Sequence, residues 1–267
     1  MELLFMILIL IVFAVTVIGF SFSLLHGEKA WAINDDDALM LYFTFDEDDG
    51  GKVLDVSGNN LEGKFEGAVW SKDGKFGGAV HLEDTEKFVE VDAVPELDIT
   101  DELTIQAWFF PEESQGDSNL MGRRSGANVG GYCLQWSAQF TGSPQIETWI
   151  NIGGWQGSRN KQTIKPALEK WHHVSSTYDG DMIRQYIDGE LDVEFEPPAG
   201  KINSIDVVFR IGKAQTGLKG MVGLVDEVAI YDRALTVEEI NQDMENGVFF
   251  AVSPKDKLAT TWGKLKM

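Results

Sequence analysis

Residues 223–247 read GLVDEVAIYDRALTVEEINQDMENG and decide the fold, because they contain a strand, a turn and a helix in succession. Residues 223–231 are rich in apolar and β-branched side chains, which predicts a strand with both faces covered. Asp226 and Glu227 interrupt this run. A buried carboxylate is tolerated only when it is paired, hydrogen-bonded or bound to a metal, so Asp226 is a candidate functional residue. Alternation predicts one strand face with Leu224, Val228 and Ile230 and another with Val225, Ala229 and Tyr231.

A short helix is predicted directly after this strand. Thr236 offers a capping oxygen, and Glu239 three residues later completes the spacing of a capping box. Ile240 and Met244 follow at helical spacing, and Gly247 provides the stop. No stretch before Thr236 has the pattern of a long amphipathic helix.

The rest of the chain consists of short apolar stretches separated by turn residues. This pattern is typical of an antiparallel sandwich of two sheets. Asp188 and Gly189 form a strong hairpin signal between two of the stretches. The predicted strands are residues 38–45, 79–83, 88–92, 103–110, 132–137, 146–152, 172–178, 182–187, 191–195 and 207–211. The predicted fold class is therefore all-β, with one short helix near the C-terminal end.

Several phrases of the sequence occur in the order known from one family of such folds. They are LYFTFDEDDGGKVLDVSGNNLEG at residues 41–63, FGGAVHL at 76–82, KWHHVSSTYDGDMIRQYIDG at 170–189, and the stretch at 223–247. Together they resemble the LamG-like jelly-roll domains of the concanavalin A-like lectin/glucanase superfamily. The resemblance implies a two-sheet antiparallel jelly-roll sandwich over residues 33–250.

The first 32 residues are predicted to be a signal peptide. Residues 3–25 carry no charge and are largely apolar, and Ala30-Trp31-Ala32 provides a small-x-small cleavage site. We expect cleavage after this site, a mature protein that begins at Ile33, and export to a secreted, cell-surface or periplasmic location. A signal anchor is the alternative, because the apolar run is as long as the roughly 20 residues that span a bilayer and no basic residue precedes it.

The charge of the chain narrows the choice of partners. The formal net charge is −21 at pH 7. Such a surface repels phosphate backbones and anionic lipids, so we expect no nucleic acid partner and membrane contact only through an uncleaved leader. Residues 251–267 are basic by contrast and are predicted to be a flexible tail. Cys133 is the only cysteine, so an intramolecular disulfide is excluded and a buried side chain is expected there.

The acidic loop at residues 46–63 is the best candidate for a calcium site. Calcium takes about six to eight oxygen ligands from carboxylates and carbonyls, and Asp46, Asp55 and Asn60 could supply them. In the resembling family a structural calcium often lies between the opening loop and the closing strand, which would add Asp226 to the set. Asx-turn hydrogen bonds explain Asp55 and Asn60 equally well without a metal.

Catalytic residues are not predicted. Asp192, Glu194 and Glu196 alternate along a strand, which is similar to the carboxylate row of jelly-roll glucanases. Their order differs from the Glu-x-Asp-x-Glu row of those enzymes. The alternating residues Leu191, Val193 and Phe195 predict an inner apolar face with solvated carboxylates outside. His172 and His173 are neighbours on a strand, so they point to opposite faces and do not form a metal pair.

A ligand-binding set is predicted around a glycine-rich turn that holds Trp155. Asn151, Gln156 and Arg159 lie beside it in the sequence. Sugar-binding proteins commonly present aromatic faces next to hydrogen-bonding amide and guanidinium groups. We therefore predict that these four residues contact a ligand. The tryptophans assigned to the core are Trp108, Trp149 and Trp171.

These observations favour one class of function over two others. The first is a non-catalytic recognition module that binds carbohydrate or a cell-surface or matrix partner, with a structural calcium. The alternatives are a glycoside hydrolase on the same fold and a structural component of an envelope. The sequence favours the recognition module because no glucanase row in its usual order and no nucleophile with an adjacent base is found. Fold alone does not choose between them.

Overall fold

The computed structural model describes residues 36–114, 116–125, 130–137, 144–215 and 217–248. The predicted leader at residues 1–32 and the predicted tail at residues 251–267 lie outside these ranges. Within them, no helix is both long and apolar enough to cross a membrane.

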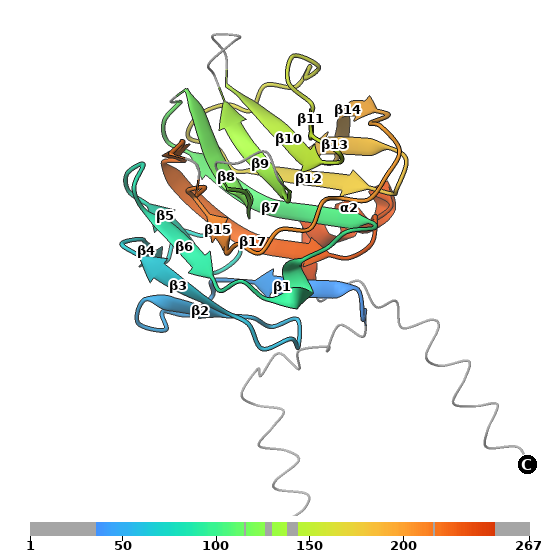
Figure 1. The fold of residues 1–267 in the computed structure, drawn as a ribbon. Helices are drawn as coiled ribbons and strands as arrows, with labels where there is room; N and C mark the ends of the chain where they lie inside the picture. Colours follow the sequence, from blue (N-terminus) through green and yellow to red (C-terminus); the bar gives the residue numbers. More distant parts are fainter. Residues whose placement is uncertain (1–35, 115, 126–129, 138–143, 216, 249–267) are drawn as a thin grey trace, which may run out of the picture. The chain divides into compact units, whose positions relative to one another are not determined.

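The described residues fold into two antiparallel β-sheets that pack face to face (Figure 1). In spatial order, sheet A contains β14 (Glu190–Phe195), β13 (Ile183–Ile187), β12 (His172–Tyr178), β7 (Leu103–Pro111), β17 (Gly223–Tyr231), β5 (Ala79–Leu82) and β4 (Val69–Ser71), with β1 (Leu39–Phe43) paired to β17. Sheet B contains β11 (Trp155–Gly157), β10 (Gln145–Asn151), β9 (Tyr132–Ser137), β8 (Asp117–Arg123), β15 (Phe209–Ile211), β6 (Phe88–Val91), β3 (Glu62–Glu66) and β2 (Lys52–Leu54), with β16 (Lys219–Gly220) parallel to β8. A 3-10 turn η1 (Pro95–Leu97) and the helix α2 (Val237–Asn246) complete the fold. The predicted all-β sandwich with one short helix is confirmed.

The hydrophobic core lies between the two sheets. Phe109 of β7 and Trp136 of β9 meet there edge to face, with ring centroids 5.7 Å apart, and both side chains are almost fully buried. Burial of one large apolar side chain contributes about 1.5–3 kcal/mol. This contact therefore fixes β9 of sheet B against β7 of sheet A.

The closing strand β17 lies in sheet A between β7 and β5. A β-bulge at Asp226 and Glu227 interrupts its pairing with β7, and Glu227 has a left-handed φ of 52°. Val225 and Val228 therefore both belong to the core between the sheets, whereas Leu224 does not. The predicted faces of Leu224 and Val225 were wrong, because the extra residue of the bulge shifts the alternation by one position.

Helix α2 begins at the predicted capping box. Thr236 Oγ1 accepts a hydrogen bond from the backbone N–H of Glu239, and the Glu239 carboxylate accepts one from the backbone N–H of Thr236. Ile240 of the helix is buried against Ala229 and Tyr231 on the outer face of β17. The helix thus covers the outer face of the C-terminal part of β17, which explains why Ala229 and Tyr231 there are apolar.

The predicted hairpin between β13 and β14 is present. Asp188 and Gly189 form its turn with φ values of 51° and 81°, the positive angles that a type I′ turn requires. The Asp188 carboxylate also accepts a hydrogen bond from the backbone N–H of His173 at 2.8 Å. The turn is therefore fastened to the start of β12.

Strand β14 departs from simple alternation. Its pairing with β13 shifts register beside Asp192, whose carboxylate turns inward and accepts hydrogen bonds from the backbone N–H groups of Thr163 and Ile164, both at 2.7 Å. Leu191 is 52% exposed. The prediction of a solvated Asp192 beside an inward Leu191 was wrong, because the bulge reverses their directions.

Some short strands were not predicted from the sequence. They are β2, β3, β4, β8, β11 and β16. The most consequential of them is β8, because it lies in the middle of sheet B. A register shift between Asn119 and Met121 places Leu120 and Met121 together in the core. A strand with two consecutive inward residues has no regular alternation to detect.

Candidate functional site

The outer face of sheet B carries aromatic and polar side chains at its β11 edge. Trp155 begins β11 and lies directly opposite Asn151 of β10. The Trp155 ring is half-buried, and the guanidinium carbon of Arg124 lies 4.8 Å from its centroid. Such a stacked pair is worth about 0.5–1 kcal/mol at an exposed position. Ring and guanidinium group together offer an apolar surface and hydrogen-bond donors at the same place.

The two predicted amides lie on different faces of the sheet. Asn151 is buried, and its Oδ1 accepts hydrogen bonds from the backbone N–H of Gly154 at 3.2 Å and from Asn203 Nδ2 at 3.0 Å. Gln156 lies opposite the core residue Ile150, so it points away from the Trp155 face. Asn151 therefore shapes the turn before Trp155, and the binding role of both amides stays a prediction.

Arg159 forms a bridge between two carboxylates of the same outer face. Its Nε donates to both oxygens of Glu147 at 2.9 Å, and its guanidinium group donates to Asp117 at 3.0 Å. Partial burial opposes the charge, but the two carboxylates hold the pKa of Arg159 above its usual range. Glu147 belongs to β10 and Asp117 to β8, so the bridge crosses over β9, which lies between them.

Trp149 belongs to this face and not to the core. Its Nε1 donates to Glu147 at 3.0 Å, and the Arg159 guanidinium carbon lies 5.1 Å from its ring centroid. The ring rests on the backbone of Gly157, where a Cβ atom would come within 2.5 Å of it. The prediction of a core position was wrong, because Trp149 alternates with Ile150, which points into the core.

A polar row crosses the middle of this outer face. Asn119 of β8, Gln135 of β9 and Glu147 of β10 lie directly opposite one another. They are 0%, 1% and 2% exposed. Three of their amide atoms have no hydrogen-bond partner among the described residues: Oδ1 and Nδ2 of Asn119 and Nε2 of Gln135. The sequence signal was local: Gln135 stands between the core residues Leu134 and Trp136, and Glu147 directly follows the core residue Ile146.

Two of the four predicted calcium ligands, Asp46 and Asp226, lie against residues 76–77. Asp226 accepts hydrogen bonds from the backbone N–H of Phe76 at 3.0 Å and from that of Glu227 at 2.8 Å. Asp46 lies against Gly77, where a Cβ atom would be 1.9 Å from its Oδ1. Burial raises the pKa of Asp226 to about 9, and the charges of Glu227 and Asp46 act in the same direction. A cation at this point would relieve that repulsion, so these two side chains fit the proposed metal.

The other two predicted ligands are engaged within the opening loop. Asp55 Oδ1 accepts hydrogen bonds from the backbone N–H groups of Tyr42 and Ser57, both at 2.9 Å. Asn60 donates to the carbonyl oxygen of Gly58 at 3.0 Å. These turn contacts account for both residues without a metal. In the described part of the chain, no group of three or more His, Cys, Asp or Glu side chains is arranged around a metal position, and calcium binding stays a prediction.

The two strand histidines occupy different environments. His173 is buried on the outer face of sheet A, with its ring centroid 5.4 Å from that of Trp108. Burial lowers the pKa of His173 to about 3, against the opposing charge of Asp188. His172 is directed to the other face, where its ring packs on Phe109 of the core. The predicted opposite directions of the two histidine rings are thereby confirmed.

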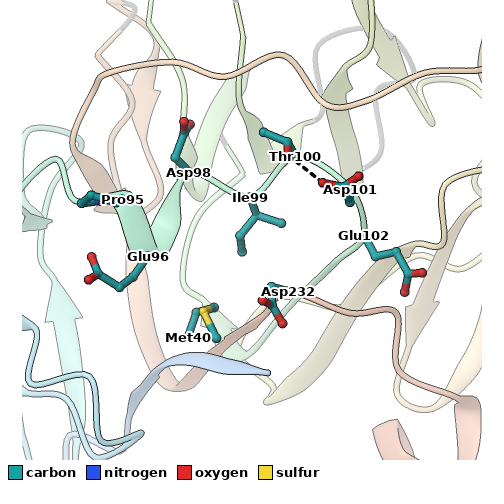
Figure 2. A pocket seen from close by; sticks show the side chains of 9 residues that line it. All are labelled: Met40, Pro95, Glu96, Asp98, Ile99, Thr100, Asp101, Glu102 and Asp232. Carbon is teal, nitrogen blue, oxygen red and sulfur yellow. Dashed lines mark hydrogen bonds between the residues drawn. The ribbon is translucent and has the colours of Figure 1, made fainter. Parts of the chain in front are cut away.

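An acidic pocket of about 450 Å³ lies beside β1, η1 and the end of β17 (Figure 2). Its lining residues are Met40, Pro95, Glu96, Asp98, Ile99, Thr100, Asp101, Glu102 and Asp232. Asp98 forms an ion pair with Arg123 at 3.1 Å, and Asp101 forms one with Lys201 at 2.6 Å. Burial raises the pKa of Asp232. None of the residues predicted as ligand or metal contacts lines this pocket.

Comparison with known protein families shows to which family this chain is related. A family model of the concanavalin A-like lectin/glucanases superfamily matches residues 83–241. The chain belongs to this superfamily. The resemblance drawn from the sequence phrases is thereby confirmed. A search of curated proteins finds no match.

Solved structures with a similar fold include several binding domains. Domain 4 of AbnA, a GH43 extracellular arabinanase from Geobacillus stearothermophilus in complex with arabinotriose, has a TM-score of 0.62 and 19% identity, over 76% of this chain and 97% of that domain. The binding domain of Paraclostridial Mosquitocidal Protein 1 has a TM-score of 0.60 and 17% identity, over 77% and 51%. The binding domain of botulinum neurotoxin serotype G has a TM-score of 0.58 and 15% identity, over 76% and 50%. The chain spans about half the length of the two toxin domains, and identities this low show the shared fold.

Proposed function

We propose that this superfamily member is an exported, non-catalytic recognition module that binds a glycan or another cell-surface partner. The observation that carries the proposal is the Trp155–Arg124 pair at the β11 edge of sheet B, next to a polar outer face. An aromatic ring packs against the apolar face of a sugar, and guanidinium and amide groups bond its hydroxyls. The complex of AbnA domain 4 with arabinotriose and the binding domains of the toxins support a recognition role.

Trp155→Ala is expected to weaken glycan binding by at least about tenfold, which corresponds to about 1.4 kcal/mol. The ring supplies contact area at an edge strand, so its loss should change the melting temperature little. A glycan array on the wild-type protein identifies the ligand, and calorimetric titration then gives the Kd of both proteins.

Trp171→Ala is the matched control, because Trp171 is also a half-buried tryptophan but precedes β12 of sheet A and packs on Phe110. It should leave the Kd unchanged. A large fall in melting temperature for Trp155→Ala, or equal Kd values for all three proteins, would contradict the assignment of Trp155 to the binding surface.

The glycoside hydrolase alternative is tested in the same experiments. Asp192 is occupied by backbone hydrogen bonds, and Glu194 is paired with Arg184 at 2.6 Å, which favours structural roles for both. Each polysaccharide that binds should also be assayed for turnover. Turnover that Glu194→Gln abolishes would overturn the non-catalytic proposal. An empty array would favour a structural envelope component instead.

Calcium is expected to stabilise the fold through Asp46 and Asp226. A ligand that binds only the folded state adds about 2.7 kcal/mol at a hundredfold excess over its Kd. Asp226→Ala should remove most of the gain in melting temperature between chelator and calcium. Asp55→Ala is the control, because it should weaken the opening loop and leave the calcium response intact. Identical wild-type melting temperatures in calcium and in chelator would rule out the site.

A further inference from the structure

We propose that the middle of the outer face of sheet B is a subsite for an uncharged saccharide, with Asn119 and Gln135 as its floor. This inference rests on the proposed glycan recognition and extends it from the Trp155 edge toward the centre of the sheet. It also assigns a ligand class, because the groups on this face distinguish charged from uncharged sugars.

The floor consists of amides that the protein leaves unbonded. Both amide atoms of Asn119 and Nε2 of Gln135 are buried without a partner among the described residues. Gln185, another fully buried amide, shows the usual situation: its Oε1 accepts from Thr148 Oγ1 at 2.8 Å, and its Nε2 donates to Asp192 at 2.9 Å. Buried polar groups are normally hydrogen-bonded, and a site built for a hydroxylated ligand is where they stay open for it.

Two acidic and two basic side chains of this outer face have formal charges that cancel. Asp117 and Glu147 carry two negative charges, and Arg124 and Arg159 carry two positive ones. Arg159 bonds both carboxylates in the structure, and the sum of these four formal charges is zero whether or not this bridge is closed. The net charge of −21 repels anionic sugars at longer range. Hydroxyl groups both donate and accept, which matches amides that offer a free N–H and a free carbonyl oxygen.

Access to the floor leads past Arg159. Its bridge crosses over β9, the strand that carries Gln135, and its side chain is 24% exposed. Binding at the proposed subsite requires this long side chain to turn aside, because the two amide side chains are closed to solvent. The Trp149 ring, fixed on Gly157 and bonded to Glu147, then forms a side wall.

Two isosteric variants separate a binding role from a structural one. Asn119→Leu and Gln135→Met remove unbonded amides at nearly constant volume, so the melting temperature should stay the same or rise. Binding of neutral trisaccharides (arabinotriose, xylotriose and cellotriose) should fall by at least about tenfold, equivalent to about 1.4 kcal/mol. Wild-type protein should bind at least one of them about tenfold more tightly than trigalacturonate. Gln185→Met is the matched control and should lower the melting temperature, because it breaks satisfied hydrogen bonds.

The possible contrary results distinguish a failure of the subsite from a failure of glycan recognition. Unchanged Kd values for Asn119→Leu and Gln135→Met, with the loss seen in Trp155→Ala, would remove the floor from the site and leave glycan recognition standing. A melting temperature for Asn119→Leu that falls as far as that of Gln185→Met would show a structural amide and overturn the subsite. Tighter binding of trigalacturonate, or no binding of any of these trisaccharides, would also overturn it. The proposed function fails only if the wider array is empty as well.

Discussion

Gly223→Ala is expected to lower the free energy of unfolding by about 3 kcal/mol or more. Gly223 begins β17 with φ at 137°, and a Cβ atom there would lie 2.0 Å from the carbonyl oxygen of Phe110 and 3.0 Å from the backbone nitrogen of Glu112. An unfavourable φ costs about 1–3 kcal/mol, and overpacking costs a similar amount. Both atoms belong to the backbone of the β7 end, so the clash separates the two central strands of sheet A.

Urea denaturation of purified protein measures this loss. Gly153→Ala is the matched control, because Gly153 also has a positive φ, at 63°, but a Cβ atom there meets nothing within 4 Å. It should cost about 1 kcal/mol from backbone strain alone. Equal losses in the two variants would show that the contact with β7 adds nothing to the backbone strain.

Acidification is expected to lower the free energy of unfolding through the buried side chain of His173. Its pKa is lowered from 6.5 to about 3, mainly by burial, so the folded protein keeps this ring neutral while the unfolded chain takes up a proton below pH 6.5. The stability that depends on the neutral ring is complete well above pH 6.5 and decreases as the pH falls, with a slope that approaches about 1.4 kcal/mol per pH unit well below pH 6.5. Between pH 6.5 and 4.5 the loss amounts to about 2 kcal/mol.

The comparison with His173→Leu isolates this contribution. Burial raises the pKa of Asp243 to about 6, so that group stabilises the fold on acidification, but it does so in wild type and variant alike. The difference in unfolding free energy between wild type and His173→Leu should therefore shrink by about 2 kcal/mol from pH 6.5 to 4.5. His81→Leu, at a partly exposed histidine bonded to Glu112, serves as the control. A difference for His173→Leu that does not vary with pH would contradict a buried neutral ring.

The sequence by itself determined the features that depend on neighbouring residues. The capping box of Thr236 and Glu239 is a contact over three residues, and the Asp188-Gly189 turn is a matter of local backbone angles. Alternating apolar stretches separated by turns specified a two-sheet sandwich, because burial of one strand face requires a second layer. The position of Trp155 at the end of a strand was also predictable from its neighbours, because a glycine-rich turn marks such an end.

Only the tertiary structure decided where strands break their alternation and which side chains meet. The bulges at Asp226 and Asp192 arise from pairing with neighbouring strands, and each moves side chains to the opposite face. The row of Asn119, Gln135 and Glu147 depends on the register of three strands. Arg159, close to Trp155 in sequence, bonds across the sheet to carboxylates of β8 and β10. Such contacts join residues that are distant in the chain, and no local pattern encodes their register.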